Sequence, residues 1–504
     1  MVFMARFFIV FFLLPFLSLQ AEVSQAQIKA TQQYIVSIKT RSVVSSQGQD
    51  GTFFGTGSII DKNAGIILTN AHVVGTDRVV PFYEITLNSG QEVKARFLYA
   101  DPWHDFAFLV VEEGDRAKLP AEMPIDNRFV KVGEPVYIIG KNENKHFSTQ
   151  TGTIASPYET SDVLPYQVFR ISLNAQGGAS GSPVCAEDGK VIGLLHASNG
   201  VTSAFALPIA YAVDALTQLK DSKKPARFHI GVILDYVSLD DLVRFYRFSQ
   251  PIAEKFRNKF PDSFNRGLVV SDILVGSPAE GVFQVGDVVI KINDIEFGPD
   301  LYLFDRTINQ LAVSHPDVEI SFTVIRLGEE KILKVKPYNL QKRVIRRLVQ
   351  FGGAIFYEAD DSVTRRTGAR NYPVFITSIR PGSSFMEKLP VIPRTNSTLV
   401  AVHRINDKTI KSLDDLIEII PDLMKKEDFF MFYTNYAIDF GIDSAPLFAQ
   451  TMRIENASYN PHDGLPEVFT FDEDKKQWNL KTIEETKTEL PKDVQTKPAW
   501  GGGV

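Results

Sequence analysis

The sequence predicts a mostly β protein, with two β-barrels side by side followed by two smaller α+β units. Short runs of β-forming residues alternate with Gly, Asn and Asp turns over residues 27 to 125, and residues 126 to 208 repeat this style. No strand–helix–strand alternation interrupts either stretch, which is typical of all-β barrels. Beyond residue 227, a pattern of strand, turn, strand and helix occurs once clearly and once more faintly.

Local patterns predict several elements within this plan. The run Tyr34–Ile38 is one of the β-rich runs of the first barrel. In the third unit Ser238 opens a helical insertion, with Asp241 three residues on as its capping partner. In the fourth unit a helix follows Ser412 and is expected to end before Pro421.

Composition limits the classes of function. With 504 residues the chain has room for about three domains. The formal net charge is only −6 and there is no dense Lys/Arg run, so binding to nucleic acid is not expected. The single cysteine, Cys185, excludes an intrachain disulfide framework and any multi-cysteine metal site. The eight histidines show no metal-ligand spacing, so neither a metal nor another cofactor is expected.

The N-terminal residues 1–26 have the layout of a secretory signal peptide. Arg6 precedes the apolar run Phe7–Leu19, and small residues follow, with cleavage expected after Ala21 or Ala26. The apolar run is short for a bilayer span, and no other segment is long and apolar enough. The sequence therefore predicts an exported protein without a stable membrane span. It would reside in the periplasm if the source is Gram-negative, and at the membrane if the segment is retained.

The stretch 177–184, with the sequence GGASGSPV, presents a serine in a tight loop between two predicted strands. Small neighbours allow a substrate backbone to approach, and glycine accepts the dihedrals that aim successive N–H groups at one point. Upstream, the run TNAHVV places His72 at the end of an apolar strand. The run DPWHDFAFLVV places Asp105 just before another strand. The order His72, Asp105, Ser180 is the triad order of two-barrel serine proteases.

Each of these residues has an alternative interpretation. His72 could be a hydrogen-bonded core histidine, and Asp105 could simply form a turn. Asp101 and His104 offer a competing acid and a competing base, and Ser182 is an alternative nucleophile.

Four runs together resemble the protease domain of the HtrA/Deg family: GTGS at 55–58, TNAHVV, DPWHDFAFLVV and GGASGSPV. The variants WHDF and ASGSP are similar to the branch that includes the large fungal and plant Deg proteins. The resemblance implies a chymotrypsin-like double β-barrel followed by two PDZ-like domains. The expected organisation is a signal peptide at 1–26, a trypsin-like protease domain at 27–220, a PDZ domain at 227–340, a PDZ-like domain at 345–440, a C-terminal extension at 441–480 and a disordered tail at 481–504.

The resemblance also implies roles for the site residues. Ser180 is the nucleophile, His72 the general base and Asp105 the group that orients His72. The N–H groups of Gly178 and Ser180 form the oxyanion hole. Ala179 and Ser182 depart from the residues usual in the family, although neither change removes a proton-transfer group.

Two binding regions follow from the same resemblance. Asn174, Leu195 and His196 lie where the family builds its primary specificity pocket, which implies a medium apolar side chain before the cleaved bond. The run Ile230, Gly231, Val232 resembles the carboxylate-binding loop and strand of a PDZ domain, where a C-terminal peptide adds a strand. The alternative for this unit is a rigid spacer. Peptide binding by the second PDZ-like domain is in doubt, because Ser-Thr at 397–398 replaces the Gly-Asp of the first copy.

Two functions from different classes follow. The first is an exported serine endopeptidase that degrades unfolded or damaged proteins in quality control and stress response. The second is a proteolytically silent, peptide-binding chaperone or scaffold. The resemblance implies a homotrimer or a higher assembly, with Tyr34, Phe53 and Phe54 either at the contact between copies or in the barrel core.

Overall fold

The structure is a computed structural model. It describes residues 23–41, 52–75, 83–141, 146–161, 164–221, 223–261, 265–358, 374–388, 398–425, 430–438, 447–452 and 462–483. The predicted signal peptide up to residue 22 and the predicted disordered tail from residue 484 lie outside the described residues. Within the described ranges, no helix combines the length and apolarity needed to cross a membrane.

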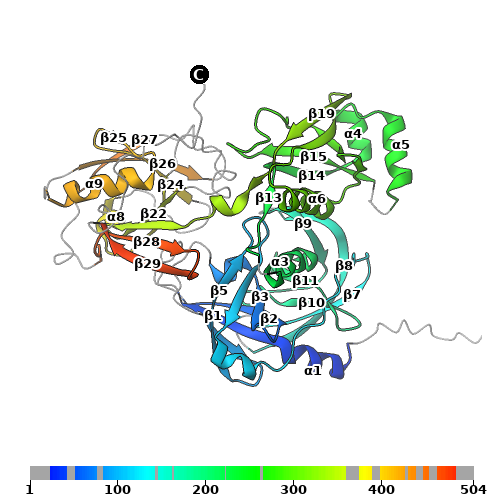
Figure 1. The fold of residues 1–504 in the computed structure, drawn as a ribbon, viewed down its shortest axis with the longest axis horizontal. Helices are drawn as coiled ribbons and strands as arrows, with labels where there is room; N and C mark the ends of the chain where they lie inside the picture. Colours follow the sequence, from blue (N-terminus) through cyan, green and yellow to red (C-terminus); the bar gives the residue numbers. More distant parts are fainter. Residues whose placement is uncertain are drawn as a thin grey trace, which may run out of the picture.

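Two closed six-stranded barrels form the first half of the chain and lie in the lower part of Figure 1. The strand order is β1-β2-β3-β6-β5-β4 in the first barrel and β10-β11-β12-β9-β8-β7 in the second. All neighbouring strands within them are antiparallel. The strands of the first are β1 (Ile35–Arg41), β2 (Thr52–Asp61), β3 (Ile66–Thr69), β4 (Tyr83–Leu87), β5 (Glu92–Ala100) and β6 (Ala107–Val111). Those of the second are β7 (Pro135–Gly140), β8 (Ser148–Ser161), β9 (Leu164–Ile171), β10 (Pro183–Ala186), β11 (Val191–Ser198) and β12 (Ala204–Pro208). The predicted mostly β fold with a double barrel is confirmed.

One buried apolar cluster spans both barrels, and another lies within the second barrel. A single buried cluster contains Ile67 of the first barrel and Cys185 of the second, so the two units fold against each other. Three short helices flank them: α2 (Ala71–Val74), the 3-10 helix η1 (Glu113–Lys118) and α3 (Ala210–Lys220). The thiol of Cys185 is free and buried, as its place in an apolar strand suggests.

The chain enters the first barrel through a helix that the sequence pattern did not reveal. Tyr34 was expected at the start of a strand, but it is the last residue of α1 (Gln25–Tyr34). Ser24 and Gln27 form a capping box at the start of this helix, which gives a polar segment with little apolar periodicity a defined beginning. Tyr34 is buried, which supports its core alternative, whereas Phe54 is 37% exposed.

The third unit is a sheet in the order β14-β15-β16-β18-β19, with β17 paired to β16. The predicted helical insertion consists of two helices, and Ser238 accepts a hydrogen bond from the N–H of Asp241 at 3.0 Å, as predicted. The elements are β13 (Phe228–His229), β14 (Val232–Ser238), α4 (Leu239–Phe245), α5 (Gln250–Lys259), β15 (Arg266–Ile273), β16 (Val288–Ile292), β17 (Ile295–Glu296), α6 (Leu301–Ser314), β18 (Ile320–Arg326), β19 (Glu329–Val335), β20 (Tyr338–Asn339) and the 3-10 helix η3 (Leu340–Arg343).

The fourth unit is a nine-stranded sheet in the order β27-β26-β24-β23-β22-β21-β28-β29, with β25 paired to β24. Its strands continue past residue 440, because β27, β28 and β29 come from the region expected to form a separate extension. The elements are β21 (Arg347–Phe351), β22 (Ala354–Glu358), β23 (Val374–Ile379), α8 (Ser384–Lys388), β24 (Thr398–Ile405), β25 (Lys408–Thr409), α9 (Leu413–Lys425), β26 (Phe430–Ile438), β27 (Leu447–Met452), β28 (Glu467–Asp472) and β29 (Gln477–Thr482).

Helix α9 ends later in the chain than the sequence predicts. The sequence predicts its end before Pro421, but the helix continues through this proline to Lys425. Pro421 lacks one N–H donor, at a cost of a few kcal/mol in a helix interior. Burial of Leu416, Ile420 and Leu423 on the same helix face offsets this cost.

A buried network of charged groups joins the third unit to the first barrel. Arg227, in the linker, donates to Asp101 Oδ2 from Nε at 2.8 Å and from Nη2 at 2.7 Å. His104 lies between two carboxylates, with Nδ1 3.1 Å from Asp101 Oδ1 and Nε2 3.4 Å from Asp305 Oδ2 of α6. His229 Nε2 lies 3.5 Å from Asp305 Oδ1. These side chains are all at most 5% exposed.

The network gives a structural role to Asp101 and His104, which the sequence offered as a competing acid and a competing base. Burial alone would raise the pKa of Asp101, but the charges of Arg227 and His104 hold its pKa well below the usual range. Each ring nitrogen of His104 faces a carboxylate oxygen, one from the first barrel and one from the third unit. Asp101 and His104 therefore connect two units of the fold.

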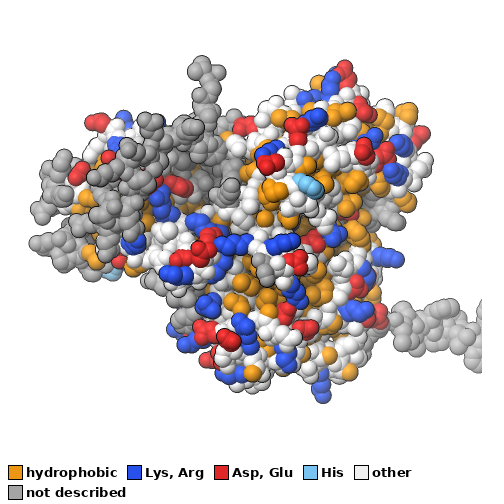
Figure 2. Space-filling view, viewed as in Figure 1, with side chains coloured by type: hydrophobic (Ala, Val, Ile, Leu, Met, Phe, Trp, Pro, Cys, Tyr) orange, Lys and Arg blue, Asp and Glu red, His pale blue; other side chains and the backbone are white. Residues whose placement is uncertain are grey.

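On the surface, basic and acidic side chains are interspersed over the face seen in Figure 2. This distribution agrees with the small net charge of −6.

The Asp101–Arg227 pair leads to a prediction about stability. R227M keeps much of the side-chain length but leaves the buried carboxylate of Asp101 without its guanidinium. We expect the free energy of unfolding to fall by about 3–5 kcal/mol, the scale for breaking a buried ion pair. Thermal denaturation followed by circular dichroism measures the change. The control is K224M, which removes an exposed pair with Asp474 from the same linker and should leave the midpoint unchanged. An unchanged midpoint in R227M would contradict this role of the pair.

Candidate active site

Ser180 lies in the loop between β9 and β10. The N–H of Ala179 donates to the carbonyl of Gln176 at 3.1 Å and closes a four-residue turn. Gly178, the third residue of this turn, has a φ of 94°, which fits a type II turn and explains the need for glycine. The sequence GGAS thus folds into a tight turn immediately before Ser180.

Thr56 of β2 fastens this loop to the first barrel. Its N–H donates to the carbonyl of Ser180 at 2.8 Å, and its hydroxyl donates to the carbonyl of Gly178 at 2.9 Å. Gly181 packs so closely here that an added Cβ would lie 2.0 Å from the carbonyl oxygen of Thr56. The same Cβ would lie 2.5 Å from Thr69 Oγ1, three residues before His72. The glycine after Ser180 therefore allows the serine loop to pack onto the strand that leads to His72.

The backbone N–H groups of the residues on either side of Ala179 remain available. Within the described part of the chain, the N–H groups of Gly178 and Ser180 have no hydrogen-bond acceptor, whereas that of Ala179 is used inside the turn. These are the two donors expected for an oxyanion hole.

Ser182, the alternative nucleophile, has a different environment. Its side chain is fully buried, and its hydroxyl donates to the carbonyl of Ala179 at 2.6 Å. Ser180, in contrast, is partly exposed and lines a cavity. The structure therefore favours Ser180 over Ser182 as the reactive hydroxyl.

The register of the first barrel brings His72 and Asp105 together. Thr69, at the end of β3, pairs with Ala107, at the start of β6, so the loops that carry the two residues leave the same end of the barrel. His72 Nδ1 lies 2.7 Å from Asp105 Oδ2, and the N–H of His72 donates to Asp105 Oδ1 at 3.0 Å. The side chain of His72 is 49% exposed and that of Asp105 is 10% exposed.

The surroundings of Asp105 keep it ionised and in place. Burial alone would raise the pKa of Asp105, but the charge of His72 and the contacts with His72 and His196 hold its pKa well below the usual range. Its carbonyl accepts from the side-chain amide of Asn70 at 2.8 Å. Its N–H donates to the hydroxyl of Tyr166 at 2.8 Å, which ties the acid loop to β9 of the second barrel.

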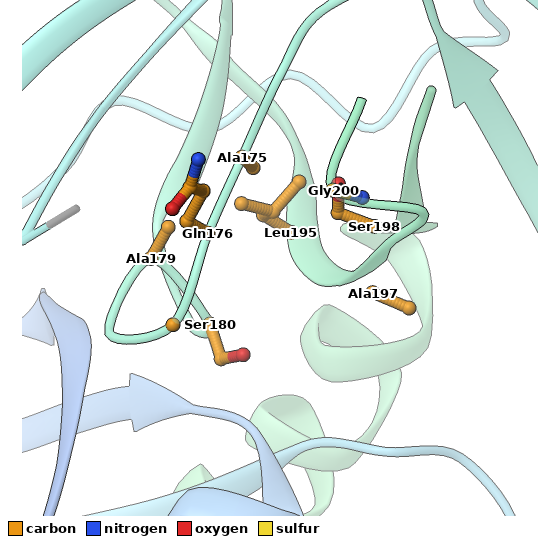
Figure 3. Close-up of a pocket in the computed structure, with 9 residues that line it drawn as sticks. Ala175, Gln176, Ala179, Ser180, Leu195, Ala197, Ser198 and Gly200 are labelled. Carbon is orange, nitrogen blue, oxygen red and sulfur yellow. Dashed lines mark hydrogen bonds between the residues drawn. The ribbon is translucent and has the colours of Figure 1, made fainter. Parts of the chain in front are cut away.

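A cavity of about 430 Å³ opens beside Ser180. Figure 3 shows Leu195 between Gln176 and Ser198, with Ser180 at the edge of the group. The lining residues are small, apolar or neutral: Ala175, Gln176, Gly177, Ala179, Ser180, Leu195, Ala197, Ser198 and Gly200. Of the three residues predicted to build the specificity pocket, only Leu195 lies in this wall. Asn174 is exposed, and His196 is buried against Asp105, because successive side chains of β11 point to opposite faces.

The predicted carboxylate-binding residues lie at the start of β14. Gly231 has a φ of 92°, and its N–H donates to Nδ1 of His229 at 3.0 Å. Ile230 is buried, and Val232 pairs with Ile273 of β15. Because β14 is the outer strand of its sheet in the described residues, its second edge faces away from β15.

Two supporting residues, Thr56 and Tyr166, have no role assigned from the sequence, and His196 is assigned to the specificity pocket and not to a contact with Asp105. Thr56 stands in the GTGS run, but the pattern gives no sign that its carbonyl and hydroxyl hold a loop of the other barrel. Tyr166 and His196 act through contacts between barrels, which no spacing within the chain encodes.

Comparisons with known proteins place a peptidase domain in the two barrels. A family model of the trypsin-like peptidase domain matches residues 55–194. A protein named pro-apoptotic serine protease NMA111 from Lodderomyces elongisporus is 27% identical over 73% of this chain and 37% of its own length. A protein named probable periplasmic serine endoprotease DegP-like from Pseudomonas fulva is 30% identical over 56% of this chain and 55% of its own length.

A solved structure described as HtrA-type protease AlgW with tripeptide is 21% identical, with a TM-score of 0.46, and covers 63% of this chain and 97% of that chain. The chain spans little more than a third of the length of the NMA111 relatives, 37% for the one from Lodderomyces elongisporus. The chain therefore carries a trypsin-like peptidase domain and is homologous to the NMA111 and DegP-like serine proteases, as its resemblance to the HtrA/Deg family predicted.

Proposed function

We propose that this chain is an exported serine endopeptidase that hydrolyses peptide bonds of unfolded or damaged proteins. The observation that carries the proposal is the paired His72 and Asp105 on one barrel, joined through Thr69 and Thr56 to the loop of Ser180 on the other. The names of the NMA111 and DegP-like relatives, both serine proteases, support it.

In the proposed reaction, His72 takes the proton of the Ser180 hydroxyl as Oγ attacks the peptide carbonyl carbon. The carbonyl oxygen becomes negatively charged and accepts hydrogen bonds from the N–H groups of Gly178 and Ser180. His72 then gives its proton to the leaving amine, and the C–N bond breaks. Water attacks the resulting ester by the same route in reverse, releasing the acid and restoring Ser180.

Asp105 makes this proton transfer possible by its geometry. Its carboxylate accepts from His72 Nδ1–H, so Nε2 is the nitrogen left to face the serine. It also stabilises the imidazolium that forms during the transfer, without itself becoming protonated. The half-exposed position of His72 suits a base that must meet an incoming substrate.

The second candidate is a proteolytically silent chaperone or scaffold. Its expected feature is the loss of a proton-transfer group or an oxyanion donor. The chain keeps His72, Asp105, Ser180 and the glycine at 178, and His72 is hydrogen-bonded to Asp105. This favours the endopeptidase.

Export and assembly form part of the proposal. The name of the DegP-like relatives includes "periplasmic", which supports export, whereas the name of the NMA111 relatives does not. Signal cleavage after Ala21 would keep the Ser24–Gln27 capping box of α1, and cleavage after Ala26 would remove its serine. A homotrimer, with the exposed ring of Phe54 near the contact, is the proposed assembly.

The first prediction concerns the nucleophile. We expect S180A to lower kcat by about a million-fold, the scale for removing the serine of such a triad. The assay combines a serine-reactive fluorophosphonate probe with an unfolded, disulfide-free protein substrate. S182A is the matched control and should keep both labelling and cleavage. If the parent protein is neither labelled nor active while it and S180A suppress aggregation equally, the chaperone function replaces the endopeptidase.

The second prediction concerns the cavity beside Ser180. Because no charged side chain among the described residues lines it, we expect cleavage after medium apolar residues such as Val or Leu. A197L narrows the cavity and should lower kcat/KM for cleavage after Leu about tenfold relative to cleavage after Ala. The control is V201L, at an exposed residue outside the wall. Equal preferences in A197L and the parent would show that the cavity does not select the side chain.

The third prediction concerns the third unit, for which we propose capture of C-terminal peptides at β14. The carboxylate would replace His229 Nδ1 as the acceptor of the Gly231 N–H. A short peptide with an apolar C-terminal residue should bind about ten times more tightly as the free acid than as the amide. Isothermal titration calorimetry measures both. Equal affinity, or no binding, would favour the rigid-spacer alternative.

A further inference from the structure

Two histidines share the carboxylate of Asp105. Its Oδ2 lies 2.7 Å from Nδ1 of His72 and 3.6 Å from Nδ1 of His196. The two rings differ in environment, since the side chain of His72 is 49% exposed and that of His196 is 3% exposed. One imidazole therefore approaches the carboxylate from the solvent side, and the other approaches from the protein interior.

The backbone of β11 aims His196 at this carboxylate. Leu195 pairs with Ala206 of β12, but the next pair is Ala197 with Phe205, so His196 is the extra residue of a β-bulge. Bulges change the direction of a side chain and often occur beside active sites. Successive side chains of a strand point to opposite faces, so Leu195 and Ala197 both line the cavity of Ser180, while His196 between them is buried against Asp105.

The position of His196 is firmly linked to the serine loop. The carbonyl of Leu195 accepts from the N–H of Gly181 at 2.9 Å, and the N–H of Leu195 donates to the carbonyl of Ser182, also at 2.9 Å. Both backbone groups of Leu195, the residue directly before His196, are therefore hydrogen-bonded to the loop that carries Ser180. A shift of His196 would disturb the serine loop and the acid together.

The polar atoms of His196 have no other role in the described structure. Its Nε2 is buried and has no hydrogen-bond partner among the described residues, so Asp105 is the polar group that the ring faces. Burial of an unpaired polar nitrogen is unfavourable, and an apolar side chain would serve packing better. The separation of 3.6 Å is longer than a hydrogen bond, but such contacts in free enzymes often tighten when substrate binds.

We propose that His196 is a positioning residue of the reaction: its Nδ1–H holds Oδ2 of Asp105 in line with Nδ1 of His72. This inference rests on the proposed function, because it assigns His196 a task within the same triad. In this role His196 affects the rate of proton transfer through Asp105. It lies outside the wall that selects the substrate side chain.

Two variants of the full chain separate this role from packing. H196N keeps an N–H donor near the position of Nδ1, whereas H196L fills similar space without a donor. We expect H196L to lower kcat about tenfold with KM within about twofold, and H196N to restore kcat to within about threefold of the parent. The fluorophosphonate labelling rate of Ser180 should follow kcat. Thermal midpoints of all three proteins establish that they are folded.

Several outcomes would overturn the inference. Equal activity of H196L, H196N and the parent would remove any role, and equal losses in both variants would show packing alone. A change confined to KM would indicate that His196 acts in substrate binding and not on Asp105. If H196L does not fold, H196Q is used instead. Glutamine carries an amide donor, but its longer side chain places that donor beyond the position of Nδ1. Activity of H196Q equal to that of H196N would then contradict the proposal. A parent protein that is neither labelled nor active would instead refute the proposed function itself.

Discussion

The arrangement of the site depends on the hydrogen bonds and the ion pair made by the buried carboxylate of Asp101. Its two oxygens accept from the hydroxyl of Tyr99, the N–H groups of Trp103 and His104, the ring of His104 and the guanidinium of Arg227. These bonds fold the segment 101–106 into one shape. As a result, His104 is directed to Asp305 of the third unit, and the adjacent Asp105 is directed to His72. One buried acid therefore fixes both the proposed catalytic acid and the contact between units.

Thr56 plays the corresponding part for the nucleophile. It lies on the first barrel but bonds the carbonyls on either side of Ala179, and its own carbonyl accepts from Thr69. The serine loop and the strand before His72 are thus connected through one residue. In both cases the proposed catalytic groups lie on short loops whose positions are set by bonds across the barrel interface, as expected for a site that needs fixed geometry.

The sequence predicts well what depends on local pattern. Alternating apolar runs identify the two barrels, and the order His72, Asp105, Ser180 with small residues around the serine indicates the proposed site. Contacts between distant segments escape such reasoning. A polar helix held by the Ser24 cap, a proline tolerated inside α9 and the strands β27 to β29 all depend on tertiary partners. The same holds for His196, whose partner Asp105 lies on the other barrel.

The most direct test of the account is a crystal structure of the full chain after reaction with a serine-directed phosphonate. The account predicts a covalent bond at Oγ of Ser180 and a phosphoryl oxygen about 3 Å from the N–H groups of Gly178 and Ser180. His72 should remain bonded to Asp105, with Arg227 on Asp101. An adduct on Ser182, or a phosphoryl oxygen directed away from both N–H groups, would contradict the account.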